Sequence, residues 1–183
     1  EHEIHSLPVL EGEELVGIVT STDFLREFSQ GELPGHQAPV SRRMTKTRDY
    51  VEADADFDTA KMEIVASGLR YLPVMKGECA LGVISNRMLR KAKCRQLLAE
   101  TLRGEADSTG TSPQVKDLVK TAPTIKPGDR LATAASLMVD YSVQAVAVVT
   151  QGHRLLGVIS EDDILQAALA GFREAELGTL ARG

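Results

Sequence analysis

Gly157-Val158-Ile159-Ser160-Glu161-Asp162-Asp163-Ile164-Leu165 is a short apolar strand that runs through a hydroxyl group and carboxylates into a helix. Residues 17–25 repeat this form, and residues 82–89 repeat it with one change. Valine and isoleucine favour a buried strand, a hydroxyl side chain favours a helix N-cap, and acidic side chains suit the first turn of a helix. The pattern alone allows two interpretations: a structural joint between strand and helix, or a hydroxyl and a carboxylate that face a ligand diol.

The chain repeats itself around these joints. Gly82 aligns with Gly157, and Phe57 aligns with Leu131. We assign residues 37–104 to a middle unit and residues 114–175 to a last unit, which are two copies of one β-α-β-β-α pattern. In the middle unit we expect an extended piece at 50–52, a helix with one apolar stripe from 57, strands at 71–75 and 81–84, and a closing helix after Ser85. In the last unit we expect an extended piece at 124–126, a helix from 131 that Asp129 caps, strands at 145–149 and 155–159, and a closing helix after Ser160.

Residues 1–36 contain only the last part of this pattern, two strands and a helix, and we call them the half unit. A lone β-β-α piece would leave an apolar face uncovered, so we expect a further strand and helix upstream of it. Residues 105–113 are expected to be a flexible linker and residues 176–183 a tail. The sequence predicts an α+β fold built from one half unit and two complete units.

Composition excludes several classes of function. The net charge is −5, basic residues are dispersed, and aromatic residues make up only 4% of the chain, so neither a phosphate-binding surface nor a stacking platform for nucleic acid is expected. No apolar run approaches the roughly 20 residues of a membrane-spanning helix, and the acidic N-terminus is unlike a signal peptide. Cys79 and Cys94 form no CxxC pair and fit a reducing compartment. We expect a cytoplasmic protein without direct membrane contact, although a soluble tail of a membrane protein would read the same way.

No catalytic or metal-binding constellation is found in the sequence. His2, His5, His36 and His153 are scattered, without the spacing or acidic partners of a metal site or an acid–base pair. His153 falls in a turn, where it is expected to be solvated, with contact to a ligand phosphate as the alternative. We therefore expect no enzyme activity and no bound metal.

The three copies of an apolar strand, a glycine-containing turn and a Gly-Val-Ile-Ser-like joint resemble CBS domains, modules named after cystathionine β-synthase. The resemblance covers nearly the whole chain. It implies that the two complete units pack sheet to sheet as a tandem pair, the Bateman module, and that such modules form homodimers. It also implies a regulatory ligand, either AMP, ADP, ATP or S-adenosylmethionine, and no required cofactor.

By this resemblance the last unit holds the best ligand site. The aspartate of the joint would accept hydrogen bonds from both ribose hydroxyls, and such charge-assisted bonds contribute about 1.5–3 kcal/mol each. Asp162 occupies a position where the family often has a phosphate partner, so its negative charge disfavours a polyphosphate ligand. Glu161 is expected to be a solvated acid in the first turn of the helix. The expected ligand-binding residues are Thr124, Ala145, Val146, Ser160 and Asp163.

The other two units depart from the pattern. Met88 stands where the middle unit should have the aspartate, so the ribose clamp is lost there, and we expect Met88 to fill the vacated space as part of the core. The half unit keeps the hydroxyl and the carboxylate but lacks the leading strand. The further candidate ligand residues are Thr20, Asp23, Arg70, Ser85 and Arg87.

Two functions remain open. The first is a regulatory sensor, in which an adenosyl ligand changes how the units meet and so controls an attached domain or partner. The alternative is a ligand-free module that serves only to dimerise or assemble, for which the loss of the aspartate at Met88 is evidence.

Overall fold

The computed structural model of this chain describes residues 6–103 and 114–180. The chain divides into two packing groups that do not follow the sequence repeats. The first packing group comprises Glu1–Met44, Pro127–Gln144 and Ile159–Gly183, and the second comprises Thr45–Lys126 and Ala145–Val158. The expected flexible linker lies outside the described residues.

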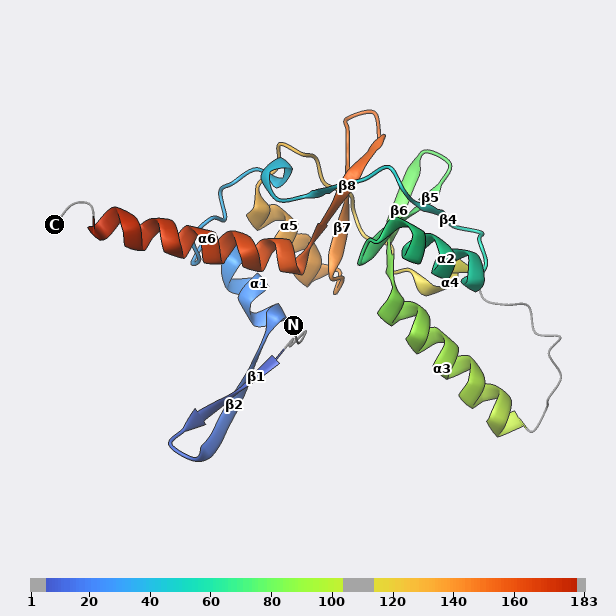
Figure 1. The fold of residues 1–183 in the computed structure, drawn as a ribbon, viewed down its shortest axis with the longest axis horizontal. Coiled ribbons are helices and arrows are strands. Elements are labelled where there is room, and N and C mark those ends of the chain that lie inside the picture. The colour runs from blue at the N-terminus through green and yellow to red at the C-terminus, as the bar shows by residue number, and fades with distance from the viewer. Residues whose placement is uncertain (1–5, 104–113, 181–183) are drawn as a thin grey trace. The chain divides into compact units, whose positions relative to one another are not determined.

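The second packing group contains the two sheets of the complete units (Figure 1). One sheet has the order β4 (Val51–Glu52), β5 (Tyr71–Lys76), β6 (Cys79–Ser85), with β4 parallel and β6 antiparallel to β5. The other has the order β3 (Thr45–Lys46), β8 (Leu155–Ser160), β7 (Ala145–Val149). Strand β3 belongs to the sequence of the middle unit yet pairs with β8 of the last unit, which the repeat pattern did not predict.

The two sheets meet through a small apolar cluster. Its members are Tyr71 and Val83 from one sheet and Ala145 and Val158 from the other, and all are at most 6% exposed. Burying such side chains stabilises a fold by about 1.5–3 kcal/mol for each large residue. The expected sheet-to-sheet packing of the two complete units is therefore confirmed.

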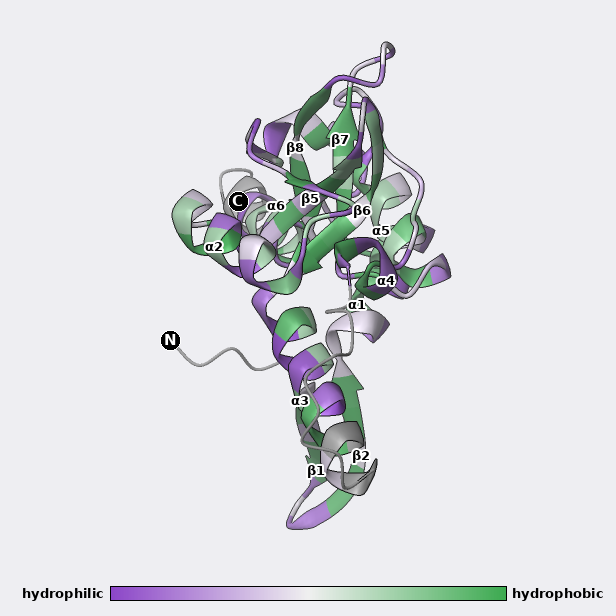
Figure 2. Cartoon of the chain, turned by 90° about the vertical axis from the view of Figure 1, so that its right-hand side faces the viewer, coloured by the Kyte–Doolittle hydropathy of each residue, from purple (hydrophilic) through white to green (hydrophobic). Residues whose placement is uncertain are grey.

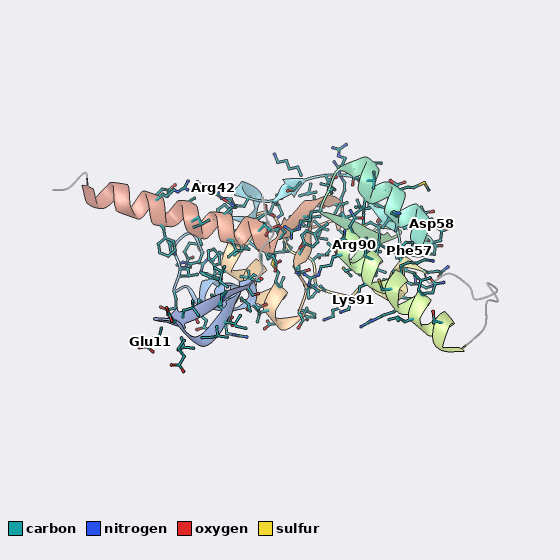
Figure 3. The ribbon with its side chains drawn as sticks, turned by 60° about the horizontal axis from the view of Figure 1, so that its bottom comes forward. Glu11, Arg42, Phe57, Asp58, Arg90 and Lys91 are labelled. Carbon is teal, nitrogen blue, oxygen red and sulfur yellow. The ribbon has the colours of Figure 1, made fainter. Side chains whose placement is uncertain are left out.

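Three helices complete the second packing group. Helix α2 (Phe57–Ser67) is capped at its start by the Asp56 side chain and ended by Gly68 in the left-handed conformation. Helix α3 (Asn86–Arg103) follows β6 directly, and α4 is the short segment Val115–Leu118. Figure 3 labels Phe57 and Asp58 at the start of α2 and Arg90 and Lys91 on α3. The core beneath these helices is aliphatic, as the low aromatic content implies.

The first packing group brings the half unit together with helices of the last unit. Helix α1 (Ser21–Gln30) contacts α5 (Leu131–Asp140) and α6 (Glu161–Leu180), and its Leu25 and Phe28 are buried. A short helical turn, η1 (Val40–Arg42), precedes the strand β3. The N-cap residue of α5 is Arg130, whose side chain makes no capping hydrogen bond, so the expected capping by Asp129 stays a prediction.

The hairpin of the half unit leaves apolar side chains in solvent. It consists of β1 (Ser6–Glu11) and β2 (Glu14–Thr20), and Figure 2 shows hydrophobic residues along both strands. Leu7 and Ile18 are 54% and 65% exposed, whereas the equivalent Leu72 and Val83 of the middle unit are 0% and 6% exposed. The difference arises because the hairpin has no counterpart of β4 and α2 among the described residues. No helix of the described residues is long and apolar enough to cross a membrane.

The glycine of each strand-to-helix joint has a different environment. A Cβ on Gly157 would collide with the backbone oxygen of Thr45, since β3 crosses beside β8 there. A Cβ on Gly82 would lie 2.7 Å from the Lys120 oxygen, but nothing lies within 4 Å of one on Gly17. Glycine is therefore required by close backbone approach in the complete units but not in the described half unit.

Candidate functional site

The joint of the last unit forms a reciprocal cap at the start of α6. The backbone nitrogen and the hydroxyl of Ser160 donate hydrogen bonds to Asp163 Oδ2, at 2.8 and 2.7 Å, and the Asp163 nitrogen lies 3.4 Å from Ser160 Oγ. This arrangement is a capping box with aspartate at the third helical position. Asp163 Oδ1 accepts no hydrogen bond within the described part of the chain.

The half unit has the same cap at the start of α1. The Thr20 nitrogen and hydroxyl donate to Asp23 Oδ2 at 2.9 and 2.7 Å, and the Asp23 nitrogen lies 3.4 Å from Thr20 Oγ1. Here the second carboxylate oxygen is engaged as well, because Arg26 Nη1 lies 3.3 Å from Asp23 Oδ1. The two joints thus share one local geometry but differ in what their carboxylates can still accept.

The middle unit keeps half of the cap. The Met88 nitrogen lies 3.4 Å from Ser85 Oγ, and no carboxylate of the described residues accepts a hydrogen bond from the Ser85 backbone. Met88 is partly buried and packs against the aliphatic core, as expected, and its filling of the vacated ligand space stays a prediction. Arg87 is exposed, and the guanidinium of Arg70 lies 5.5 Å from the centre of the Tyr71 ring, where cation–π attraction holds it.

Glu161 was expected to be a solvated acid, and that expectation is wrong. The side chain is only 3% exposed. Its Oε1 accepts a hydrogen bond from Gln144 Nε2 at 3.1 Å, and its Oε2 lies 3.4 Å from the hydroxyl of Ser21. Glu161 therefore joins the start of α6 to the start of α1, a role that no local pattern in the sequence signals.

The two capped aspartates have opposite electrostatic environments. Burial raises the pKa of Asp163 above its ordinary value of 3.8, and the charge of Asp162 adds to this, while hydrogen bonds from Ser160 and the charge of Arg43 oppose it. Hydrogen bonds from Thr20 instead hold the pKa of Asp23 below 3.8. Asp163 is thus a desolvated carboxylate that gains from additional hydrogen-bond donors. Arg43 is a nearby cation that the motif comparison did not find.

The remaining expected site residues lie in the second packing group. Ala145 and Val146 are buried in β7, and Ile125, next to Thr124, exchanges backbone hydrogen bonds with Ala147 and Val149. Ser160 and Asp163 lie in the first packing group, where the Glu161 nitrogen donates to the Gln144 oxygen at 2.9 Å. The structure thus brings Ser160 and Asp163 together, and it places Thr124 beside β7. That Ser160 and Asp163 form one ligand site with Thr124, Ala145 and Val146 stays a prediction.

Comparison with known proteins identifies the repeats. The family model of the CBS domain matches residues 1–30 and 115–170, which are the half unit and the last unit. The CBS domain-containing protein CBSCBSPB1 of Arabidopsis thaliana is 26% identical over 192 residues, which cover 86% of this chain. The chain spans only 34% of the length of that relative.

Solved structures share the fold. Protein MJ1225 of Methanocaldococcus jannaschii has a TM-score of 0.64 and 21% identity, with 89% of this chain and 59% of that chain covered. CBSX2 in complex with AMP has a TM-score of 0.51 and 21% identity, with 72% and 96% covered. The CBS domain pair of protein MJ0100, in complex with 5′-methylthioadenosine and S-adenosyl-L-methionine, has a TM-score of 0.55 and 15% identity, with 70% and 94% covered.

The middle unit lies outside both stretches matched by the family model, in keeping with its missing aspartate. Its sheet nevertheless packs against the sheet of the last unit, as in a tandem pair. The half unit and the last unit thus match the CBS domain model, and the chain shares the fold of a CBS domain pair.

Proposed function

We propose that the chain is a regulatory module that binds an adenosyl ligand at the last unit and controls an attached domain or partner. The single observation that carries this proposal is the state of Asp163. Its carboxylate is partly buried and retains one oxygen without a hydrogen bond from the described residues, whereas the identically capped Asp23 has both oxygens engaged. A ribose diol would supply the two donors that such a carboxylate lacks.

The ligands of solved relatives support the same chemistry. AMP, 5′-methylthioadenosine and S-adenosylmethionine, named in the complexes of two structurally similar proteins, share the adenosine moiety and differ in charge and phosphate content. Adenosine with its diol is therefore the element that the ligands of those complexes share. We infer the same element as the ligand of this chain.

The charges around Asp163 narrow the choice of ligand. The charge of Asp162 raises the pKa of Asp163, and the charge of Arg43 lowers it. This balance opposes a triphosphate and suits an uncharged or cationic 5′ substituent. We expect 5′-methylthioadenosine, S-adenosylmethionine and, next, AMP to bind more tightly than ATP.

Regulation requires that the ligand bind one arrangement of the units better than another. Asp163 caps the start of α6, and Glu161 in the same helical turn contacts Ser21 at the start of α1. The proposed ligand-binding carboxylate of Asp163 is thereby coupled to α1 within the first packing group. A ligand that pulls on Asp163 would therefore change the contact between α6 and α1. We propose that this contact, in a homodimer, is the element that the ligand controls.

Calorimetric titration with 5′-methylthioadenosine, S-adenosylmethionine, AMP and ATP tests the proposal. The matched control ligand is 2′-deoxy-5′-methylthioadenosine, which lacks one hydroxyl of the diol. We expect binding in the order given above and weaker binding of the deoxy control by about tenfold, or about 1.4 kcal/mol. Equal binding of the diol and deoxy compounds would contradict the assigned role of Asp163.

A ligand-free assembly module is the second candidate, and one observation favours it. Both aspartates of the joints already have a structural role in capping boxes, so their presence alone does not require a ligand. If none of the adenosyl compounds binds at millimolar concentration while the chain forms stable dimers, this second function replaces the first.

A further inference from the structure

A second candidate site lies at the hairpin turns of the complete units, and none of its lining residues belongs to a joint. The β5–β6 and β7–β8 turns lie close together in the second packing group and point the same way in Figure 1. With the segment before β4 they line an open pocket of about 420 Å³. This volume falls within the roughly 300–1,000 Å³ of small-molecule pockets.

The pocket has an apolar floor and a cationic rim. Met75 and Leu155 are 5% and 8% exposed and form the floor, and the half-exposed Tyr50 adds an aromatic wall. Arg48 and Arg154 lie at the rim. The lining therefore combines a surface for an apolar group with donors for an anion.

The arginines are not neutralised by the protein itself. Neither Arg48 nor Arg154 forms an ion pair within the described part of the chain. Glu78 also lines the pocket but makes no ion pair with them, and the neighbouring Asp49 turns its carboxylate to the Thr47 hydroxyl at 3.2 Å. Two arginines face one glutamate here, although the whole chain carries a net charge of −5.

His153 occupies this pocket at a conformational cost. Its φ is +62°, whereas the positive-φ residues of the other two hairpin turns are Gly12 and Gly77. Turns of this kind favour glycine because a Cβ is strained in the left-handed region, although histidine tolerates it better than most residues. A residue with a strained backbone whose side chain lines a pocket is a reason to look for a functional role.

We propose that this pocket binds a small phosphate monoester with a flat apolar group. Arg48 and Arg154 would hold the phosphate through their planar donors, His153 would contribute a further donor, and Met75, Leu155 and Tyr50 would cover the apolar part. The ligand needs no diol, so this site is independent of Asp163 and of the function proposed above. It would provide a second input to the same module.

Phenyl phosphate is the probe that tests this site, because it carries the phosphate and a flat ring but no adenosine. Calorimetric titration of the whole chain should show that phenyl phosphate binds. Inorganic phosphate should bind more weakly, and phenol should not bind. The double variant Arg48→Gln with Arg154→Gln should bind about tenfold more weakly or worse. The matched control is Arg90→Gln with Arg95→Gln on α3, which removes the same charge and should leave the affinity unchanged.

A variant of the strained residue gives an independent readout. His153→Gly should raise the melting temperature slightly, because glycine relieves the positive-φ strain, and should weaken phenyl phosphate binding at the same time. A merely structural histidine would show the first effect without the second. The proposal is overturned if phenyl phosphate does not bind at millimolar concentration, or if the α3 control variant weakens binding as much as the pocket variant. An unchanged affinity in Asp163→Asn is expected and separates this site from the adenosyl site.

Discussion

The carboxylate of Asp163 accepts two hydrogen bonds from Ser160, one from its backbone nitrogen at 2.8 Å and one from its hydroxyl at 2.7 Å. Both use the same oxygen, Oδ2, and leave Oδ1 for another donor. The joint is therefore a helix cap and a candidate ligand clamp at once. The structural and functional interpretations of the motif are compatible because a carboxylate has two oxygens.

The capping role predicts a moderate loss of stability. Ser160→Ala removes the hydroxyl that binds the Asp163 carboxylate and nitrogen, and loss of such an N-cap costs about 0.5–2 kcal/mol. Thr20→Ala should act in the same direction at the start of α1. Urea denaturation followed by circular dichroism measures both, and Ser160→Thr, which keeps the hydroxyl, is the control. An unchanged midpoint for Ser160→Ala would show that the cap does not support the fold.

The two aspartates should affect stability with opposite dependence on pH. The folded-state pKa of Asp163 lies above 3.8, so the folded state binds more protons than the unfolded state, and its contribution falls as pH rises from 3.8 through the raised pKa. The folded-state pKa of Asp23 lies below 3.8, so its contribution rises as pH rises through the window beneath 3.8. Relative to the unchanged chain, Asp163→Asn should gain stability as pH rises, and Asp23→Asn should lose it.

Denaturant titrations of both variants between about pH 3 and 6 check this prediction. Parallel profiles for the two variants would contradict the different environments of the two carboxylates. The comparison is controlled internally, because both substitutions remove the same charge from the same type of cap.

Replacing the joint glycines by alanine should cost very different amounts of stability in the last unit and in the half unit. Gly157→Ala places a methyl group against the Thr45 backbone, which cannot move without breaking the pairing of β3 with β8, so we expect a loss of about 2 kcal/mol or more. Gly17→Ala meets open space and should change stability by less than about 0.5 kcal/mol. Thermal denaturation measures both variants. Similar melting temperatures would mean that β3 does not lie beside β8 in solution.

Much of the fold follows from patterns within short windows. The strand 145–149 is found as predicted, and the closing helices begin directly after Ser85 and Ser160, because β-branched runs, turns and N-caps are local signals. The strand β3 was missed because it is only two polar residues long, Thr45 and Lys46, and owes its existence to β8. Its pairing is a tertiary effect that no periodicity reports.

The site was only partly predictable for the same reason. Ser160 and Asp163 lie three positions apart, so their contact could be expected from the motif. The burial of Glu161 depends on Ser21, which is 140 positions away in the sequence, and on Gln144. The pocket at the hairpin turns likewise draws its arginines from separate segments, so the sequence showed His153 only as a turn residue.

The most direct test of the proposed function is the binding of 5′-methylthioadenosine to the unchanged chain, to Asp163→Asn and to Asp23→Asn, measured by isothermal titration calorimetry. This ligand is uncharged and retains the diol, so no phosphate contact obscures the result. Asp163→Asn should bind about tenfold more weakly or worse, since charge-assisted hydrogen bonds are lost, and Asp23→Asn should bind as the unchanged chain does. Equal affinity in all three proteins, or no binding to the unchanged chain, would contradict the assignment of Asp163 as the ribose clamp.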